Sequence, residues 1–203
     1  MKIIRKKSKG VASNPKVLVV DLITGESRII DKIPYLFGSS NTADWQIPNH
    51  EGENSNQVQI SHSGKNSAFA LSPHYFSESP MLLDGALFQH PSEMVLERGM
   101  MLKIHGYLLG VVLTKKPEEF LQSLNLGEWM VFEGVTNEIL GTVSLHEIPT
   151  LVSSSPFAFE NCAFSLPSLG APGAWLRDLA DIFQPQHSDA EAVSEPEPPP
   201  FKE

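Results

Sequence analysis

Short apolar runs separated by turn residues fill the chain from residue 16 to residue 113. The runs are brief and rich in β-branched or aromatic residues, which is typical of strands. Glycine, proline, serine and asparagine stand between them, and no amphipathic helix of convincing length precedes residue 115. Many short strands at close spacing predict an antiparallel β-sandwich or barrel. The expected strands are residues 16–22, 27–30, 33–37, 57–60, 68–71, 81–83, 93–96, 101–104 and 107–113.

The composition changes at residues 115–126, which we expect to form a linker or a short helix. Two further strands are expected at residues 129–132 and 138–143. Ser144 and Glu147 then have the spacing of a capping box, in which the two side chains satisfy amide donors at a helix start. The helix is expected over about residues 145–151, since Pro149 lies near its end.

The last ordered elements are expected between residues 157 and 183. Residues 157–164 fit another strand, and residues 172–183 fit a helix. Trp175, Leu176, Leu179 and Phe183 fall on one face of that helix. Together these elements predict a small α+β unit over residues 127–184.

Residues 185–203 are polar, acidic and rich in proline. Such a segment cannot bury enough apolar area to offset its ordering entropy. We expect a disordered tail with local polyproline II character.

Composition narrows the class of protein. The 203 residues are 41% hydrophobic and 19% charged, with a net charge of −9, so we expect a globular protein without a general nucleic-acid surface. A basic cluster at the start is expected to be a solvated terminus. It consists of Lys2, Arg5, Lys6, Lys7 and Lys9.

The cysteine and hydropathy patterns indicate a cytoplasmic location. Cys162 is the only cysteine, so no disulfide can form within the chain. The basic start has no apolar signal-peptide region after it, and the longest apolar stretch, residues 107–113, is too short to cross a bilayer. We expect no integral membrane segment.

The motifs of common active sites are absent from the sequence. There is no Gly-x-Ser-x-Gly elbow and no phosphate-cradling glycine loop. Cys162 lies in an apolar run and is expected to be a core residue. The seven histidines are scattered without helical ligand spacing. We therefore expect no enzyme, no cofactor and no metal; an enzyme or metal site assembled from the histidines is the alternative. The histidines are His50, His62, His74, His90, His105, His146 and His187.

One segment resembles the opening of forkhead-associated (FHA) domains. In that family a strand ends in Gly-Arg, and an aspartate followed by alternating apolar residues comes a few positions later. Gly38 and the run Asp44-Trp-Gln-Ile47 match this pattern. Ser39 stands where the family has arginine.

The middle and end of the same region continue the resemblance. Ser61 and His62 match the start of the family's Ser-x-x-His-Ala motif, although Gly64 is an alternative for the ligand-binding serine. Asp84 matches a strand end, without the usual asparagine-glycine turn. The run Leu96-Glu-Arg-Gly99 resembles the closing Leu-x-x-Gly motif. The resemblance covers residues 17–113 and implies an FHA-like sandwich over residues 1–114.

This resemblance implies a module that binds peptides containing phosphothreonine, but the missing arginine removes the charged group that such recognition uses. We therefore expect a non-enzymatic adaptor or scaffold that binds a protein or peptide partner without phosphate. The alternative is a phosphopeptide-binding signalling module that uses Ser39, Ser61 and Lys65. The candidate loop residues are Ser39, Ser40, Ser61, His62, Lys65 and Asn66.

The second unit resembles a shortened GYF-like domain. The family's order is a tryptophan strand, a Gly-Pro-Val-Ser segment with a short helix, and a Gly-x-x-x-Trp segment, and residues 129, 141–144 and 170–175 follow that order. Thr142 replaces the proline, and Val131 stands where a tyrosine is common. The resemblance implies docking of proline-rich segments on aromatic side chains. Trp129, Phe132 and Trp175 are the candidates, and the alternative is that they fill a small core. The chain's own residues 195–201 are a conceivable ligand.

Overall fold

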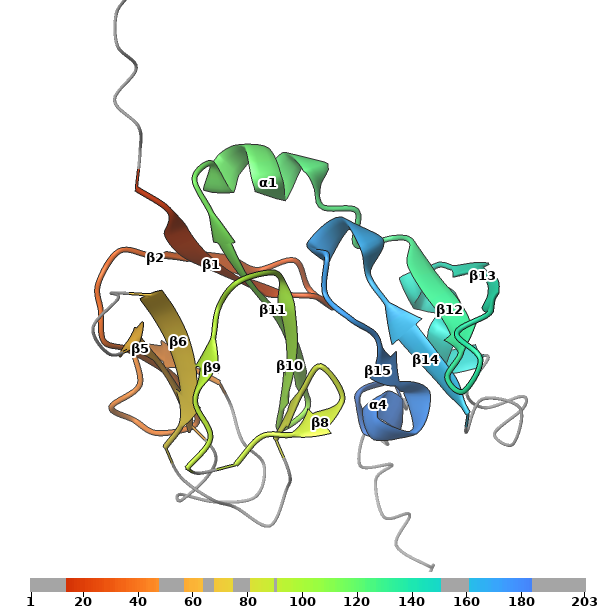
Figure 1. The fold of residues 1–203 in the computed structure, drawn as a ribbon, viewed down its shortest axis with the longest axis horizontal. Coiled ribbons are helices and arrows are strands. Elements are labelled where there is room, and N and C mark those ends of the chain that lie inside the picture. Colours follow the sequence, from red (N-terminus) through yellow and green to blue (C-terminus); the bar gives the residue numbers. More distant parts are fainter. Residues whose placement is uncertain are drawn as a thin grey trace, which may run out of the picture.

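The computed structural model describes residues 14–47, 57–63, 68–74, 81–89, 91–150 and 161–183. The predicted tail, residues 185–203, lies outside this part of the chain. The described residues form three sheets (Figure 1). Two of them face each other in a sandwich, and the third belongs to a second unit that packs beside it.

The larger sheet of the sandwich has six strands in the order β2-β1-β11-β10-β7-β8, and every neighbouring pair is antiparallel. The central strands β1, β11 and β10 are long and almost completely buried. The strands are β1 (Lys16–Asp21), β2 (Ser27–Ile30), β7 (Leu82–Leu83), β8 (Ala86–Leu87), β10 (Met100–Ile104) and β11 (Tyr107–Thr114).

The smaller sheet of the sandwich has five strands in the order β4-β3-β5-β6-β9. Its pairs are antiparallel except for β3 and β4, which run parallel because the connecting loop brings the chain back beside β3. The strands are β3 (Tyr35–Gly38), β4 (Trp45–Gln46), β5 (Gln57–Ser63), β6 (Ala68–Pro73) and β9 (Met94–Val95).

These two sheets confirm the predicted antiparallel sandwich. Side chains such as Val19 from β1, Phe37 from β3 and Leu71 from β6 meet in one core and are fully buried. The sequence pattern missed β4 and β8, which have two residues each and carry no readable periodicity.

The turn between β7 and β8 is built from Asp84 and Gly85. Both have positive φ, 51° and 78°, as a two-residue hairpin turn of the primed type requires. The Asp-Gly pair thus forms a tight turn at the place where the sequence comparison noted a missing asparagine-glycine.

The second unit contains a four-stranded sheet in the order β13-β12-β14-β15. The predicted strands at residues 129–132 and 138–143 are confirmed, and helix α1 (Pro117–Ser123) occupies the predicted linker. The elements of this unit are β12 (Trp129–Glu133), β13 (Ile139–Val143), η2 (Leu145–Glu147), β14 (Cys162–Ser165), η3 (Pro167–Leu169), β15 (Ala174–Trp175) and α4 (Leu176–Phe183).

Two local predictions in this unit have different outcomes. The capping box forms, since the Ser144 amide donates to Glu147 Oε2 at 2.9 Å. The helix predicted over residues 172–183 is wrong in its first part. Trp175 lies in β15, where it pairs with Ala163, and α4 begins only at Leu176. Trp175 has the spacing expected on the apolar face of a helix even though it ends a strand. Periodicity therefore did not locate the start of the helix.

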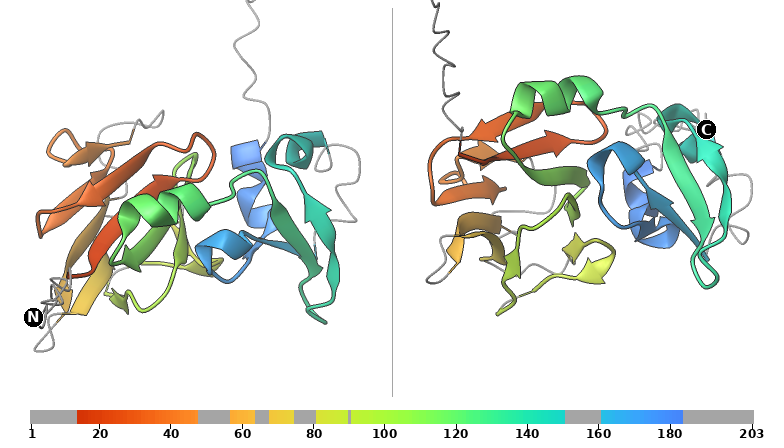
Figure 2. Two further views of the ribbon diagram at one scale, coloured as in Figure 1. Left: turned by 90° about the horizontal axis from the view of Figure 1, so that it is seen from above. Right: turned by 45° about the horizontal axis from the view of Figure 1, so that its top comes forward.

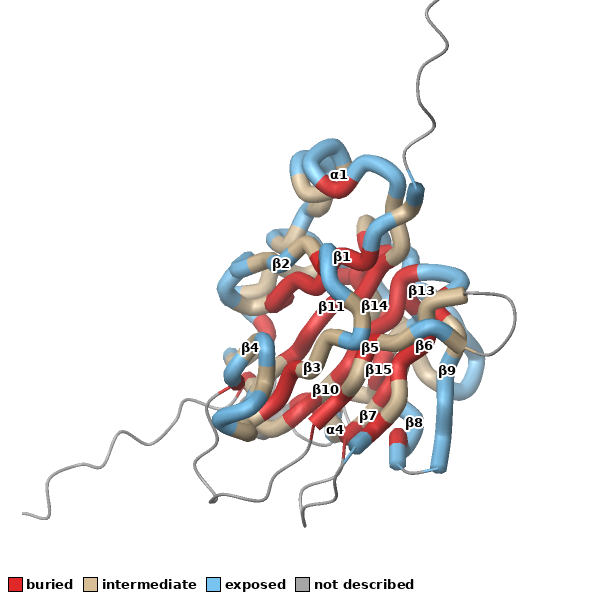
Figure 3. Tube along the Cα trace, turned by 90° about the vertical axis from the view of Figure 1, so that its left-hand side faces the viewer, coloured by how far each residue is buried: buried red, intermediate tan, exposed pale blue. Residues whose placement is uncertain are grey.

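The six-stranded sheet is the middle layer of the molecule. Its second face is covered by the second unit, as Figure 2 shows from two sides. On β1, Val17 and Val19 point into the sandwich, while Leu18 and Val20 pack against the second unit. Strands β1, β10 and β11 are therefore buried through most of their length (Figure 3).

Polar contacts join the two halves at the rim of this interface. Lys103 Nζ on β10 donates to the Asp178 carbonyl oxygen of α4 at 2.6 Å. In the linker, the Asn125 amide donates to Ser168 Oγ of the second unit at 3.1 Å. The sandwich has a core of its own and shares a second apolar core with the second unit. The two halves are therefore packed together and not joined by the linker alone. Among the helices of the described chain, none has the length and hydrophobicity needed to span a membrane.

Candidate functional site

The loop after β3 contains the residues that gave the FHA resemblance. Strand β3 ends at Gly38, whose φ of 149° favours glycine, and its carbonyl accepts the Ile47 amide at 2.8 Å. Asp44 Oδ2 accepts the Leu36 amide at 2.9 Å, and the Asp44 amide donates to the Leu36 carbonyl at 2.7 Å. Gly38 and Asp44 therefore hold the loop closed and dock β4 beside β3.

Ser40 organises the tip of this loop. Its hydroxyl lies 2.8 Å from the Thr42 hydroxyl and accepts the Thr42 amide at 3.1 Å, and its carbonyl accepts the Ala43 amide at 3.1 Å. This is the local bonding of a serine-initiated turn. Ser40 thus has a structural role that leaves a partly exposed polar tip.

Ser39 differs from its neighbour. Its Oγ is buried and has no hydrogen-bond partner among the described residues. Most buried hydroxyls in proteins have a partner, and one without is costly. The Ser39 hydroxyl therefore remains able to form a hydrogen bond beside the loop, but it is uncharged.

The structure divides the other candidate residues between two ends of the sandwich. Strands β3 and β5 are antiparallel, with Gly38 opposite Gln57 and Tyr35 opposite Ile60. Ser61 therefore lies beyond Tyr35, at the far end of the ladder from Ser39, about 17 Å away at about 3.4 Å per residue.

His62 is at the same far end, where it faces Phe69 with ring centroids 4.9 Å apart. Lys65 and Asn66 lie outside the described residues, between the paired ends Ser63 and Ala68. The structure therefore does not bring Ser39 together with Ser61 and His62, which the sequence analysis had grouped in one site. Motif spacing along the chain does not reveal which end of a strand a residue occupies.

One residue that sequence reasoning missed lies on the Ser39 side. Gln57, a buried polar residue at 7% exposure, begins β5 opposite Gly38. Its carbonyl accepts the His74 amide at 2.9 Å, and the His74 ring meets the Gln59 side chain. Gln57 opens the predicted strand over residues 57–60, and a polar residue at that first position is the sequence signal that could have found it.

The aromatic candidates of the second unit separate into two groups. Phe132 pairs with Ile139 on one side and Ala163 on the other, and Ala163 pairs with Trp175. Residues opposite each other in antiparallel strands share a face, so these four form a row across the sheet. Phe132 and Trp175 are partly exposed in this row, which we call the aromatic row.

Each of the two rings of the aromatic row packs directly against a glycine. A Cβ on Gly173 would lie 2.3 Å from Phe132 Cζ, and one on Gly134 would lie 2.1 Å from Trp175 Cζ3. The Arg177 guanidinium stands 5.2 Å from the Trp175 ring centroid, within range of a cation–π contact. The row is therefore a shaped apolar surface with one positive charge at its end.

Trp129 lies on the opposite face of the same sheet. It is fully buried, and its Nε1 donates to the Leu126 carbonyl at 2.9 Å. It meets Phe183 edge-on, with centroids 6.5 Å apart. Trp129 is thus part of the shared core, as the alternative interpretation of the aromatic candidates held.

The titratable groups form no metal cluster within the described parts of the chain. Cys162 is buried in β14, and burial raises the pKa of its thiol above the usual range, which suits a core residue and not a thiolate nucleophile.

Comparisons with known proteins give structural likeness alone. No protein-family model and no curated protein sequence matches the chain. An FHA domain of an Arabidopsis thaliana protein aligns at 13% identity and a TM-score of 0.39, over 53% of this chain and 93% of that one.

Two bacterial structures give similar values. The Mycobacterium tuberculosis Rv1747 FHA-1 domain aligns at 11% identity and a TM-score of 0.38, over 50% of this chain and 99% of that one. The FHA domain of the Chlamydia trachomatis CT664 protein aligns at 15% identity and a TM-score of 0.38, over 48% and 96%.

Proposed function

We propose that this chain is a non-enzymatic protein-interaction module with an FHA-like sandwich that binds its partner without standard phosphothreonine recognition. The proposal rests on the structure of the loop after β3. Gly38 and Asp44 keep the frame of the loop through paired backbone bonds, whereas Ser39 supplies a hydroxyl and no charge. Phosphate recognition depends on charge-assisted bonds, best made by the two-pronged arginine side chain.

The test is fluorescence anisotropy of the full chain against a degenerate phosphothreonine peptide pool and its unphosphorylated twin. We expect equal binding to both pools. We expect this binding to weaken in Ser40→Glu, at the loop, and to persist in Ser63→Glu, at the other end of β5. Binding to the phosphorylated pool alone, or equal loss of binding in both variants, would contradict the proposal.

A Ser39→Arg variant sharpens this experiment. If the loop frame still suits a phosphopeptide, the new guanidinium should create a preference for the phosphorylated pool. A wild-type protein that already prefers that pool, with the preference lost in Lys65→Ala, would instead support the phosphopeptide-reader alternative. Since Ser39 and Ser61 lie at opposite ends of the sandwich, that alternative needs a site without one of them.

The aromatic row supports a second candidate function, the docking of proline-rich segments. Phe132 and Trp175 lie in one row at partial exposure, and polyproline II ligands dock on such aromatic surfaces at low entropic cost. Glutamates in the segment 195–201 suit the Arg177 guanidinium at the end of the row.

Indole NMR resonances test this second function. We expect deletion of residues 185–203 to shift the resonance of Trp175 and not that of buried Trp129, and a peptide of residues 194–203 to reverse the shift. Unchanged indole resonances after deletion and after peptide addition would rule out docking of the tail.

A further inference from the structure

Among the sheet edges of the described residues, that of β13 is the longest. Unpaired edge strands invite pairing with other chains, and proteins limit this by shortness, charge, proline or a β-bulge. Among the described edge strands, β4, β8, β9 and β15 have two residues each, and β2 carries Arg28. Strand β13 has five residues, Ile-Leu-Gly-Thr-Val, with neither charge nor proline.

Strand β13 is also exposed. Ile139 and Leu140 are 63% and 56% exposed, and Val135 in the adjoining turn is 77% exposed. Leu140 is the extra residue of a bulge, since Val131 pairs with Gly141 and Phe132 with Ile139. Within the described chain, no strand pairs with the outer edge of β13.

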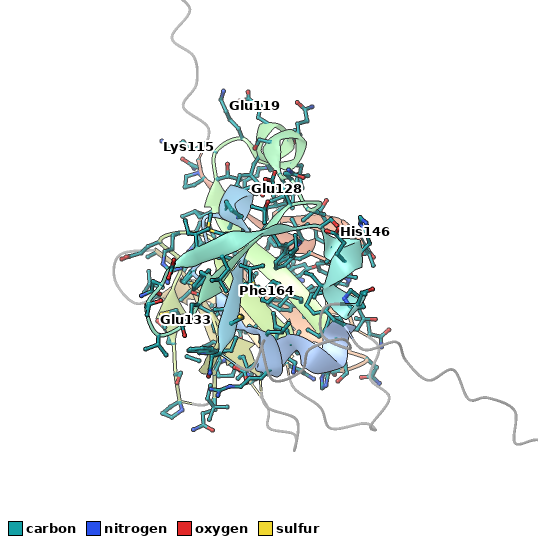
Figure 4. The ribbon with its side chains drawn as sticks, turned by 90° about the vertical axis from the view of Figure 1, so that its right-hand side faces the viewer. Lys115, Glu119, Glu128, Glu133, His146 and Phe164 are labelled. Atoms are coloured by element: carbon teal, nitrogen blue, oxygen red, sulfur yellow. The ribbon has the colours of Figure 1, made fainter. Side chains whose placement is uncertain are left out.

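Negative charge surrounds this edge. Residues 127–150, which include β12 and β13, contain four acidic residues and neither lysine nor arginine. Glu138 directly precedes β13, and Glu128 and Glu133 mark the two ends of the neighbouring strand β12 (Figure 4). Hydrogen bonds from Thr136 and Val135 lower the pKa of the Glu133 carboxyl, which favours its charged form. The edge therefore favours an extended segment that is both apolar and cationic.

The chain carries such a segment at its start. Residues 2–9 contain four lysines, one arginine and no acidic residue, and the β-branched pair Ile3-Ile4 lies among them. The chain enters the sandwich at β1, whose first residue is Lys16, and Figures 1 and 2 place that end of β1 and strand β13 on opposite sides of the molecule. This arrangement favours a contact between two molecules.

We propose that β13 of one molecule receives residues 2–9 of a second copy as an added strand. Ile3 and Ile4 would contact Ile139 and Leu140, and the basic side chains would face the glutamates at the strand ends. Pairing of β13 with β13 of another copy fits less well, because it adds acidic residues to an acidic rim. The contact is heterologous, so it links copies head to tail. It is independent of the Ser39 loop and of the function proposed for it.

The test uses a fluorescein-labelled peptide of residues 1–12, titrated with the full chain at low salt and followed by anisotropy. Leu140→Lys should weaken binding by about tenfold or more, whereas Leu87→Lys should not. Leu87 on β8 is a matched control, because it is also 56% exposed and the variant adds the same charge. A second peptide with serine in place of Ile3 and Ile4 separates strand addition from simple charge attraction.

Sedimentation velocity supplies the second measurement. We expect the full chain to associate with rising concentration at low salt, and Lys6→Glu/Lys7→Glu and Leu140→Lys to remain monomeric. High salt should weaken the association because the paired charges are exposed. Peptide binding that is equal in both lysine variants, or that survives the serine replacement, would overturn the proposal. So would a full chain that stays monomeric and fails to bind the peptide.

Discussion

Leu169 lies so close to Gly99 that a Cβ on Gly99 would stand 2.0 Å from the Leu169 carbonyl oxygen. Gly99 belongs to the sandwich, just before β10, and Leu169 ends η3 in the second unit. The Leu169 side chain also contacts Gly110 on β11, where an added Cβ would be 3.0 Å from Leu169 Cδ1. The interface between the two halves is therefore built on close approach to two glycines.

Gly99→Ala should destabilise the whole chain, by about 1–3 kcal/mol, because backbone atoms of Leu169 cannot move aside as a flexible side chain would. Urea unfolding measures the free-energy change. Gly106→Ala is the control, since a Cβ at Gly106 meets nothing within 4 Å. Equal stability of both variants would mean that the halves separate readily.

Leu169→Ala should cost about 2–5 kcal/mol through the cavity left in the shared core. Because the core around Leu169 contains side chains from both halves, we expect the sandwich and the second unit to unfold in a single transition. Two variants that retain only Trp45 or only Trp129 report on each half by fluorescence. Separate midpoints for the two tryptophans would contradict a shared core.

Asp84→Asn should change how stability depends on pH. Burial raises the pKa of the Asp84 carboxyl, even though Arg98 lies 3.1 Å away and the Met101 amide donates to Asp84 Oδ1 at 2.7 Å. With a folded pKa above the unfolded one, the folded state binds the proton more tightly, so wild-type stability falls as pH rises through that window.

Asparagine keeps an acceptor for Met101 and tolerates the positive φ of this position. The Asp84→Asn variant should therefore gain relative to wild type above the window, and the difference should shrink as pH falls. Urea titrations across the acidic range measure this. A variant that loses stability most at neutral pH would show that the half-exposed Arg98 pair outweighs the cost of burial.

Gly134→Ala should displace the Trp175 ring, because the new Cβ would overlap Trp175 Cζ3 and Cη2 at 2.1 and 2.2 Å. We expect red-shifted Trp175 emission and a loss of about 1–3 kcal/mol. Gly127→Ala is a control in the same unit, since its nearest contact is 3.4 Å, to Asn125. An unchanged emission spectrum in Gly134→Ala would show that the aromatic row is not packed as a unit.

Local sequence determined the elements whose signals are local. The strand runs of the sandwich follow from short β-branched segments between turn residues, and the Ser144–Glu147 box depends only on a three-residue spacing. Cys162 in an apolar run is a buried core residue for the same reason. The run Val17-Leu-Val-Val20 is unbroken by polar residues, and an unbroken apolar strand indicates burial on both faces.

Tertiary structure alone decided which residues share a site. Ser39 and Ser61 are separated by the register of β3 against β5, and Trp175 joins Phe132 only through two successive strand pairings. Trp129 and Phe132 lie three positions apart in one strand and so point to opposite faces, one into the core and one outward. The register of a strand, and the surroundings of each of its faces, depend on neighbouring strands that are distant in sequence. No local sequence pattern contains that information.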